Sequence, residues 1–260
     1  MKIPIYQVDA FSDQLFGGNP AAVCPLEEWL PNEIMLKIAQ ENNLSETAFL
    51  VKEKESLRIR WFTPGMEVVL CGHATLASAY VLFHELDHEG DIIYFQSLSG
   101  QLSVKRDKDY LVLDFPADKV NASKMPEGMA EALGKTPKQV FKGKTDYLLI
   151  YPHQNDIIEL SPDFGMLAKV DCRGIIASAK GRKVDFVSRF FAPRAGVNED
   201  PVTGSAHTTL TPYWSKRLEK TELEAHQLSK RGGKLRCQLR GDRVLISGKG
   251  CLYLKGEIYI

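Results

Sequence analysis

One glutamate with hydroxyl neighbours is the first residue of this chain that could move a proton. Glu46 lies between Ser45 and Thr47 and directly precedes the apolar residues 48–51. A carboxylate that is partly withdrawn from water binds its proton more tightly, so it can serve as a general base or acid near neutral pH. The same local pattern also fits a carboxylate at a solvated strand edge or a cap. Glu46 is therefore a candidate catalytic residue whose role depends on its neighbours.

A repeated pattern supplies such neighbours. Gly-X-Ala occurs at 72–74 and again at 204–206, and an aromatic-X-Pro triplet precedes each copy, at 62–64 and 191–193. Each Gly-X-Ala step opens a helix whose first N–H groups have no partner inside the helix and can bind a carboxylate or another anion. Glycines that only permit tight turns are the alternative. A tight turn does not require an aromatic-X-Pro triplet upstream, so the occurrence of this triplet before both copies indicates a duplicated module.

The two helix starts carry further candidates for substrate binding. His73 follows Gly72, where the helix dipole disfavours the imidazolium form, so a neutral imidazole could donate a hydrogen bond or pass a proton. Ser205 follows Gly204 and is the counterpart of His73, with its hydroxyl and its N–H as donors. Asp200, just before the second start, could accept a substrate amine or hydroxyl. A packed histidine and a turn-forming aspartate are the structural alternatives.

A literal zinc motif is also present. His84-Glu85-Leu86-Asp87-His88 matches the H-E-x-x-H pattern of zinc hydrolases. Zinc hydrolysis would need both histidines on one face of a continuing helix, a third ligand and a buried site. The motif instead lies in a charge-rich segment at the end of the first apolar helix. A zinc hydrolase that uses His84 and His88 is therefore retained only as an unfavoured alternative.

The composition excludes several classes of protein. The chain has 260 residues, with 33 Lys+Arg and 33 Asp+Glu, so no global charge attracts nucleic acid or an anionic membrane. No apolar run approaches the roughly 20 residues that span a bilayer, and the N-terminus lacks the features of a signal peptide. Five scattered cysteines do not suggest a disulfide framework. We expect a cytoplasmic protein with reduced thiols and with no nucleic-acid or membrane partner.

Strand patterns dominate both halves, and each half has one strongly apolar helix. The first helix is expected to run from Gly72 to near Gly90, and a strand is expected at 157–160. Strands alternating with long crossover helices are missing, so the fold class is α+β. We predict two similar halves, 1–116 and 117–260, each a strongly curved, mostly antiparallel, barrel-like sheet around a central helix. The last strand could pack back on the N-terminal half, and the active cleft would lie between the halves.

These motifs together resemble the phenazine biosynthesis PhzF-like isomerase family of the diaminopimelate epimerase superfamily. The resemblance covers essentially the whole chain in order and spacing, and it rests on residues 9–11, 18–23, 45–49, 62–64, 67, 71–76, 200–207 and 227–233. It implies two similar halves, each with a sheet around a central helix, and a site in the cleft between them. By this resemblance Glu46 shuttles a proton between carbons, while Gly72, His73, Asp200, Gly204 and Ser205 line the pocket. It implies no metal or organic cofactor, and it suggests a homodimer.

A comparison within the superfamily bears on the mechanism. Its epimerases and proline racemases use two thiols, one at each helix start, as opposing acid and base. This chain keeps Cys71 at the first start, and we assign Pro201 to the corresponding position at the second. The comparison favours a proton shuttle by Glu46 over stereoinversion and makes Cys71 structural.

The predicted function is a cofactor-independent isomerase that acts on a small carboxylate-bearing substrate. Moving a proton from carbon needs a base within hydrogen-bond reach, and it needs donors where negative charge collects. Two further alternatives remain beside the zinc hydrolase. One is an epimerase or racemase of a small amino or hydroxy acid, and the other is a protein that binds a metabolite or partner without turnover.

Overall fold

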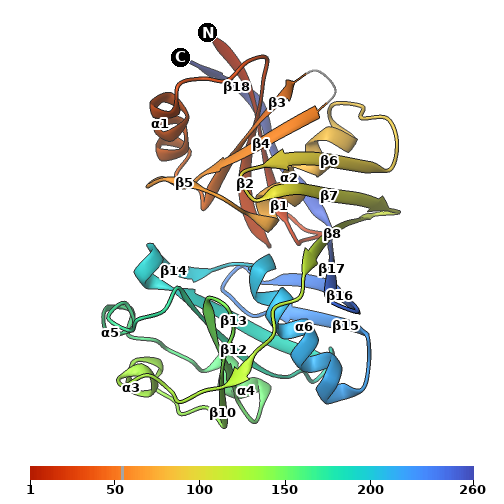
Figure 1. Cartoon of the computed structure of the whole chain (residues 1–260). Coiled ribbons are helices and arrows are strands. Elements are labelled where there is room, and N and C mark those ends of the chain that lie inside the picture. The colour runs from red at the N-terminus through yellow and green to blue at the C-terminus, as the bar shows by residue number, and fades with distance from the viewer. Residues whose placement is uncertain (54–55) are drawn as a thin grey trace. The chain divides into compact units, whose positions relative to one another are not determined.

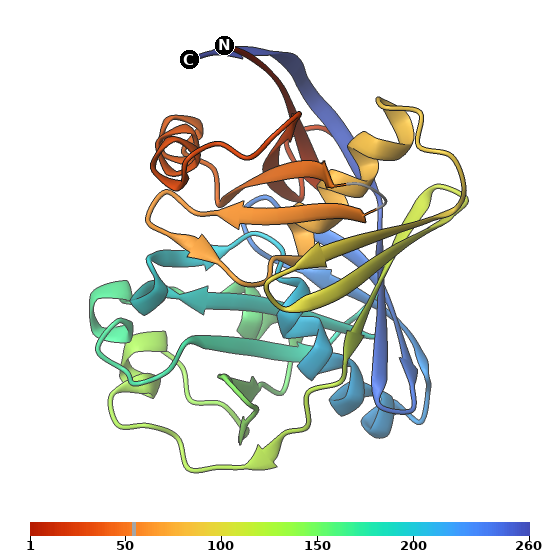
Figure 2. The same ribbon diagram turned by 45° about the horizontal axis from the view of Figure 1, so that its top comes forward.

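The computed structural model describes residues 1–53 and 56–260, and it divides into two units. Unit 1 comprises Met1–Asp114 and Ser247–Ile260, and unit 2 comprises Phe115–Ile246 (Figure 1). The final residues belong to unit 1 because the last strand, β18 (Gly250–Tyr259), pairs along its length with the first strand, β1 (Lys2–Ala10). The two ends of the chain therefore lie side by side (Figure 2), and the Ile260 N–H donates to the Met1 carbonyl at 3.0 Å.

Unit 1 is a curved sheet in the pairing order β18–β1–β2–β3–β4–β6–β7–β8. The pairs β2–β3 and β4–β6 are parallel and the others are antiparallel, and the short β5 also pairs antiparallel with β4. Its remaining strands are β2 (Asn19–Leu26), β3 (Glu46–Glu53), β4 (Ser56–Phe62), β5 (Glu67–Val68), β6 (Ile92–Ser97), β7 (Gly100–Asp107) and β8 (Tyr110–Pro116). Its helices are α1 (Asn32–Asn42) and α2 (Gly72–His84).

Helix α2 is the central helix of unit 1. It is apolar on nearly all sides and contacts β1, β2 and β3, as expected of a helix that is buried all round. The expectation that it continues to near Gly90 is wrong. The helix ends at His84, because Asp87 turns into the left-handed region (φ 48°) and the His88 N–H reaches back to the Leu82 carbonyl at 2.9 Å.

Unit 2 repeats this design in the pairing order β9–β10–β11–β12–β13–β15–β16, with the short β14 also paired to β13. Its strands are β9 (Asn121–Ala122), β10 (Gln139–Lys142), β11 (Asp146–Ile150), β12 (Gly174–Lys180), β13 (Phe186–Ala192), β14 (Val197–Asp200), β15 (Glu222–Gln227), β16 (Gly233–Arg240) and β17 (Arg243–Gly248). Its helices are α3 (Met129–Leu133), α4 (Gln154–Ile158), α5 (Phe164–Leu167), the 3₁₀ turn Pro193–Ala195 and the long α6 (Gly204–Leu218).

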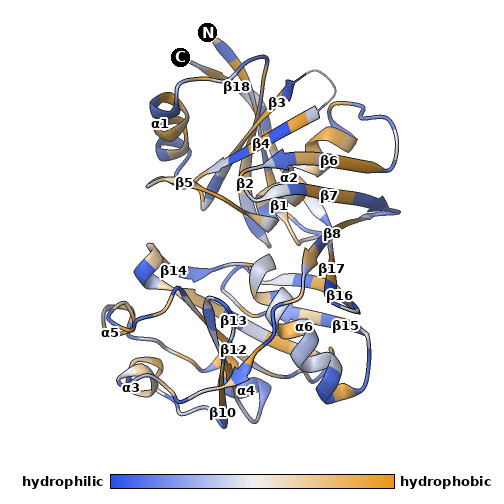
Figure 3. Ribbon diagram, viewed as in Figure 1, coloured by the Kyte–Doolittle hydropathy of each residue, from blue (hydrophilic) through white to orange (hydrophobic). Residues whose placement is uncertain are grey.

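The strand expected at 157–160 is wrong, because Ile157 and Ile158 are the last residues of helix α4, and Glu159 and Leu160 lie in the segment that follows it. The Asp156 carboxylate accepts the His153 N–H at 2.8 Å, which satisfies a backbone donor at the helix start. Ile157, the apolar residue of this turn, is buried in the core of unit 2. That core also includes the inward side chains of β12 and β13, which are rich in apolar residues (orange in Figure 3).

The predicted duplication is confirmed by the pairing pattern. In unit 1, β4 pairs antiparallel with β3 and β5 and parallel with β6, and α2 lies between β5 and β6 in the chain. In unit 2, β13 pairs antiparallel with β12 and β14 and parallel with β15, and α6 lies between β14 and β15. The α+β class is likewise confirmed, with a curved, mostly antiparallel sheet and a long helix in each unit.

One ion pair recurs at the same place in both copies. In unit 1, Arg60 on β4 donates two hydrogen bonds to Glu67 on β5, at 2.7 and 2.6 Å. In unit 2, Arg189 on β13 donates two to Glu199 on β14, at 2.7 and 2.9 Å. Such paired bonds are directional as well as strong. Each pair therefore holds the hairpin that leads into the start of α2 or α6.

In the described part of the chain, no helix combines the length and the apolar character needed to cross a membrane. All five cysteines are free thiols.

Candidate functional site

In unit 1, the first residues of two strands and the start of one helix bring Glu46, His73 and Asn19 together. Glu46 is the first residue of β3, Asn19 is the first of β2, and His73 is the second of α2, which packs on both strands. Nε2 of His73 lies 3.2 Å from Oε2 of Glu46, and Nδ1 of His73 lies 3.2 Å from the Asn19 amide nitrogen. The His73 side chain is 6% exposed and that of Glu46 is 18% exposed. A mostly buried carboxylate thus faces an imidazole.

The contacts of His73 define its charge and its tautomer. Burial lowers the pKa of His73 to about 3, so the ring is neutral at physiological pH. The Asn19 amide nitrogen is a donor, so Nδ1 of His73 accepts and the ring proton belongs on Nε2. That N–H faces Glu46. The predicted neutral imidazole at the helix start therefore lies 3.2 Å from the carboxylate, but Nε2 of His73 and Oε2 of Glu46 form no hydrogen bond with each other.

Cys71 completes this cluster. It occupies the N-cap position of α2, and its sulfur lies 3.5 Å from Nδ1 of His73. One potential ligand atom from each of Glu46, Cys71 and His73 lies within 4.8 Å of the others, so these are the residues that could hold a metal ion. Both nitrogens of His73 already face other groups, Asn19 and Glu46. Metal binding would therefore require the imidazole to exchange one of these contacts.

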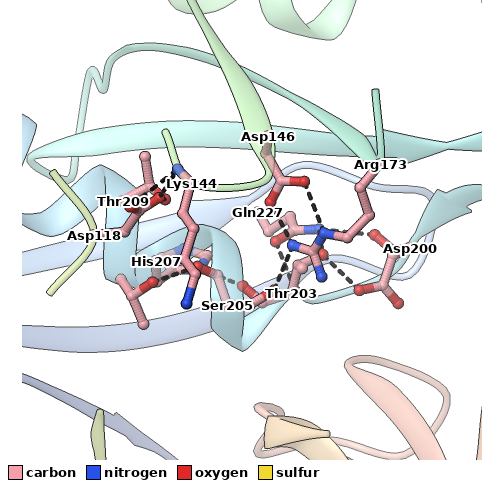
Figure 4. A network of polar contacts seen from close by, with 11 residues as sticks. Asp118, Lys144, Asp146, Arg173, Asp200, Thr203, Ser205, His207, Thr209 and Gln227 are labelled. Carbon is pink, nitrogen blue, oxygen red and sulfur yellow. Dashed lines mark hydrogen bonds and ion pairs between the residues drawn. The ribbon is translucent and has the colours of Figure 1, made fainter. Parts of the chain in front are cut away.

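The second helix start, in unit 2, has its own polar network (Figure 4). Thr203 is the N-cap residue of α6, and its hydroxyl donates to Oδ2 of Asp200 at 2.5 Å. Gln227, at the end of β15, accepts the Thr203 N–H at 2.9 Å and donates to the Asp200 carbonyl at 2.7 Å. These bonds hold the segment before the helix, so Gly204 and Ser205 begin α6 in a fixed position.

The assignment of Pro201 as the counterpart of Cys71 is wrong. Cys71 directly precedes Gly72 as the N-cap of α2, and Thr203 directly precedes Gly204 as the N-cap of α6. The matching position is set by the first residue of each helix, which is Gly72 in α2 and Gly204 in α6. Thr203 has no thiol, so two opposing cysteines are still lacking.

Ser205 has a cationic neighbour. Nη2 of Arg173 donates to Oγ of Ser205 at 3.3 Å, and the guanidinium also binds both carboxylate oxygens of the buried Asp146. Burial lowers the pKa of Arg173, but the hydrogen bonds and charge of Asp146, with the charges of Asp200 and Asp118, outweigh this and raise it. A permanent positive charge therefore stands beside the start of α6.

The structure places the six predicted site residues in two groups. Glu46, Gly72 and His73 meet in unit 1, while Asp200, Gly204 and Ser205 meet in unit 2. The sequence interpretation did not assign to the site five residues that contact these groups: Asn19, Asp146, Arg173, Thr203 and Gln227. Asn19 lies within the turn sequence Gly18-Asn19-Pro20, and this motif is the signal by which it could have been found. Arg173 and Asp146 belong to no motif.

The zinc motif does not form a site. Helix α2 ends at His84, so the motif does not present two histidines on one helical face. The His84 ring stacks on Tyr80 and its Nδ1 lies 2.9 Å from the Tyr80 carbonyl, while the His88 ring packs edge-on against Phe83. These contacts are those of a helix end at the surface, and they leave the zinc hydrolase without its structural basis.

His207 is a second buried histidine near the start of α6. It is completely buried, and its Nδ1–H donates to the Thr203 carbonyl at 2.8 Å. Burial lowers the pKa of His207 to about 4, although the bond to Thr203 opposes the shift. The unfolded chain binds a proton at this histidine below about pH 6.5, and the folded chain does not until about pH 4. Folding stability is therefore lost as the pH falls through this window.

We predict that His207→Asn flattens this pH dependence. Wild-type protein should lose up to about 1.4 kcal/mol of unfolding free energy per pH unit from His207 alone between pH 6.5 and 4. The asparagine amide can still donate to the Thr203 carbonyl but does not titrate. Urea unfolding at intervals from pH 4.5 to 7 measures the slope, with His153→Asn, at an exposed position, as the control. Equal slopes for wild type and His207→Asn would contradict the assignment.

Comparison with known proteins agrees with this architecture. The family model described as phenazine biosynthesis-like protein matches residues 8–256. An uncharacterized isomerase of Pseudomonas aeruginosa is 52% identical over 260 residues, which cover both chains completely. A crystal structure of a phenazine biosynthesis protein of the PhzF family from Enterococcus faecalis has 46% identity and a TM-score of 0.97 over the full length of both chains.

A more distant likeness extends the fold beyond these relatives. A hydroxyproline epimerase from Agrobacterium vitis matches with a TM-score of 0.62 at 9% identity, over 99% of this chain and 92% of that one. At this identity the likeness concerns the fold alone, and it agrees with the predicted epimerase-like architecture. The match to the family model over nearly the whole chain and the high identity to full-length relatives lead to one conclusion: the chain belongs to the phenazine biosynthesis-like (PhzC-PhzF) protein family.

Proposed function

We propose that this protein is a cofactor-independent isomerase that moves a proton between carbons of a small carboxylate-bearing substrate. Glu46 is the general acid and base. The observation that carries the proposal is the pair formed by Glu46 and the neutral His73, with 3.2 Å between Oε2 and Nε2 at the start of α2. Membership of a family with relatives named as isomerases supports an enzyme of this type.

The proposed reaction uses one carboxylate twice. The Glu46 carboxylate takes a proton from one substrate carbon, and the electron pair left behind delocalises toward the substrate's carbonyl or carboxylate group. The N–H groups of Gly72 and His73, at the start of α2, are donors for that negative charge. The protonated Glu46 then returns its proton to a different carbon, which shifts the double bond and restores the enzyme.

His73 supports this cycle as a neutral neighbour of Glu46, with Nε2 of the imidazole 3.2 Å from Oε2 of the carboxylate. Its Nε2–H faces Glu46, and its lowered pKa keeps it from becoming a competing acid. Asn19 fixes this tautomer through Nδ1.

A one-base shuttle agrees better with the residues at the helix starts than a two-thiol epimerisation does. The N-cap residue of α2 is Cys71, but that of α6 is Thr203, which has no comparable acidity. Epimerisation by opposing thiols would need a second cysteine at that place.

The test is solvent-deuterium incorporation by the wild-type protein into a panel of small unsaturated carboxylic acids, followed by NMR. The proposal expects a product in which the double bond has moved and deuterium stands on the newly protonated carbon. Deuterium on the original carbon with inverted configuration would instead identify an epimerase. Binding without exchange on any acid would favour a metabolite-binding protein, and stoichiometric zinc in the purified protein would require a metal-dependent mechanism.

A further inference from the structure

The two copies of the repeat present different chemistry at the same place. In unit 1, Glu46 opens β3 and contacts His73, the second residue of α2, at 3.2 Å. In unit 2, Gly174 opens the corresponding strand β12, and Ser205 is the second residue of α6. Arg173, directly before Gly174, contacts Ser205 at 3.3 Å. An acid–imidazole pair in one copy thus corresponds to a guanidinium–hydroxyl pair in the other.

Steric crowding explains why the polar side chain in unit 2 comes from Arg173. A Cβ at Gly174 would lie 2.2 Å from Cζ of Phe190, so a side chain at this position would have to displace the Phe190 ring. The counterpart of Glu46 is thus a glycine, which provides no base in unit 2. The neighbouring Arg173 supplies the charged group at the helix start instead.

The guanidinium is held in advance of any ligand. Asp146 opens β11 and pairs with Gly174 across the parallel strands, so it lies directly beside Arg173. Its carboxylate, 3% exposed, binds Nε and Nη2 of Arg173, while the Arg173 side chain remains 46% exposed. A planar guanidinium that is fixed on one edge and open to solvent suits a carboxylate, because its fork matches the two oxygens.

The nearby acidic groups are engaged in other contacts. The carboxylate of Asp200 accepts the Thr203 hydroxyl, and that of Asp118 accepts the Thr209 hydroxyl and the Lys144 N–H (Figure 4). The positive end of the α6 dipole adds to the charge of Arg173 at Ser205.

We propose that Arg173, with the Ser205 hydroxyl and the start of α6, binds the carboxylate of the substrate and so determines specificity for anionic over neutral substrates. The inference rests on the proposed function, which supplies the carboxylate-bearing substrate.

The test compares charged and neutral probes of the same shape. Benzoate, crotonate and succinate are titrated against ¹⁵N-labelled protein beside benzamide, crotonamide and succinamide, and the Ser205 N–H and Arg173 Nε–H resonances are followed. Wild type should prefer the carboxylates. Arg173→Met should weaken carboxylate binding by about tenfold or more, with amide binding unchanged, and Arg173→Lys should keep part of the preference. Arg194→Met is the matched control, because Arg194 also pairs with an aspartate, Asp171, but at the surface.

A second variant separates recognition from folding. Arg173→Met leaves the buried Asp146 without its partner, which destabilises a protein, so the double variant Arg173→Met/Asp146→Asn is titrated in parallel. Loss of carboxylate preference in both, with folding intact by circular dichroism, supports the inference. Preserved preference in the folded double variant overturns it, as does a wild-type protein that binds acids and amides equally. Glu46→Gln should keep the preference, so failure of the catalytic proposal and failure of this one give different results.

Discussion

Glu46→Gln is expected to abolish solvent-deuterium exchange at substrate carbon while the protein stays folded and still binds its ligand. The glutamine has the same shape, and its amide can occupy the place of the native carboxylate, 3.2 Å from Nε2 of His73. Its amide cannot take a proton from carbon. General-base catalysis contributes about 10²–10⁴-fold to a rate, so exchange should fall by at least this factor.

The control for this experiment lies on the same strand. Glu53 ends β3, as Glu46 begins it, and its carboxylate accepts the Trp29 indole N–H at 2.7 Å. Glu53→Gln should exchange deuterium at the wild-type rate. A Glu46→Gln protein that exchanges as fast as wild type would show that another group is the base. Equal loss in both variants would point to a general disturbance of β3.

Arg189→Met is expected to be the most destabilising of the single substitutions considered for unit 2. The Arg189 side chain, 12% exposed, binds both oxygens of Glu199 and also donates to the carbonyls of Ile157 and Leu160, at 3.2 and 2.7 Å. Removal of one partner leaves the mostly buried Glu199 charge and two carbonyls without their donor. The free energy of unfolding should fall by about 3–5 kcal/mol.

The duplicated fold provides the comparison. Arg60→Met removes the corresponding arginine of unit 1, whose additional partner is the Asn32 side chain rather than two backbone carbonyls. Urea unfolding should therefore show a smaller loss for Arg60→Met. The double variant Arg189→Met/Glu199→Gln should recover part of the stability, because it removes the unpaired charge. If Arg189→Met lost no more stability than Arg60→Met, the carbonyl contacts would have no energetic weight.

The stability of this ion pair also bears on the site. Glu199 lies on β14 directly before Asp200, so the hairpin held by Arg189 carries the network at the start of α6. A destabilised hairpin would release Thr203 and Ser205 from their positions. Function and stability therefore share this segment of the chain.

The sequence alone was sufficient for the features that arise from local patterns. The repeated Gly-X-Ala steps predicted both helix starts, because a glycine between an extended segment and an apolar run marks that transition wherever it occurs. The dominance of strand patterns in both halves predicted the α+β class, and the resemblance indicated the family. The prediction for 157–160 was wrong because a short apolar pattern fits a strand or a helix equally well. The hydrogen bond from the His153 N–H to the Asp156 carboxylate favours the helix.

Tertiary structure decided how those parts combine into a site. Asn19, Glu46 and His73 are far apart in the chain, and they meet because two strand starts and one helix start share a corner of the same sheet. Arg173 reaches Ser205 because parallel pairing of β11 with β12 places Asp146 beside it. No local pattern encodes such contacts, because they depend on strand register and not on neighbours in the chain. The sequence by itself determined which residues could do chemistry, and only the fold decided which of them contact one another.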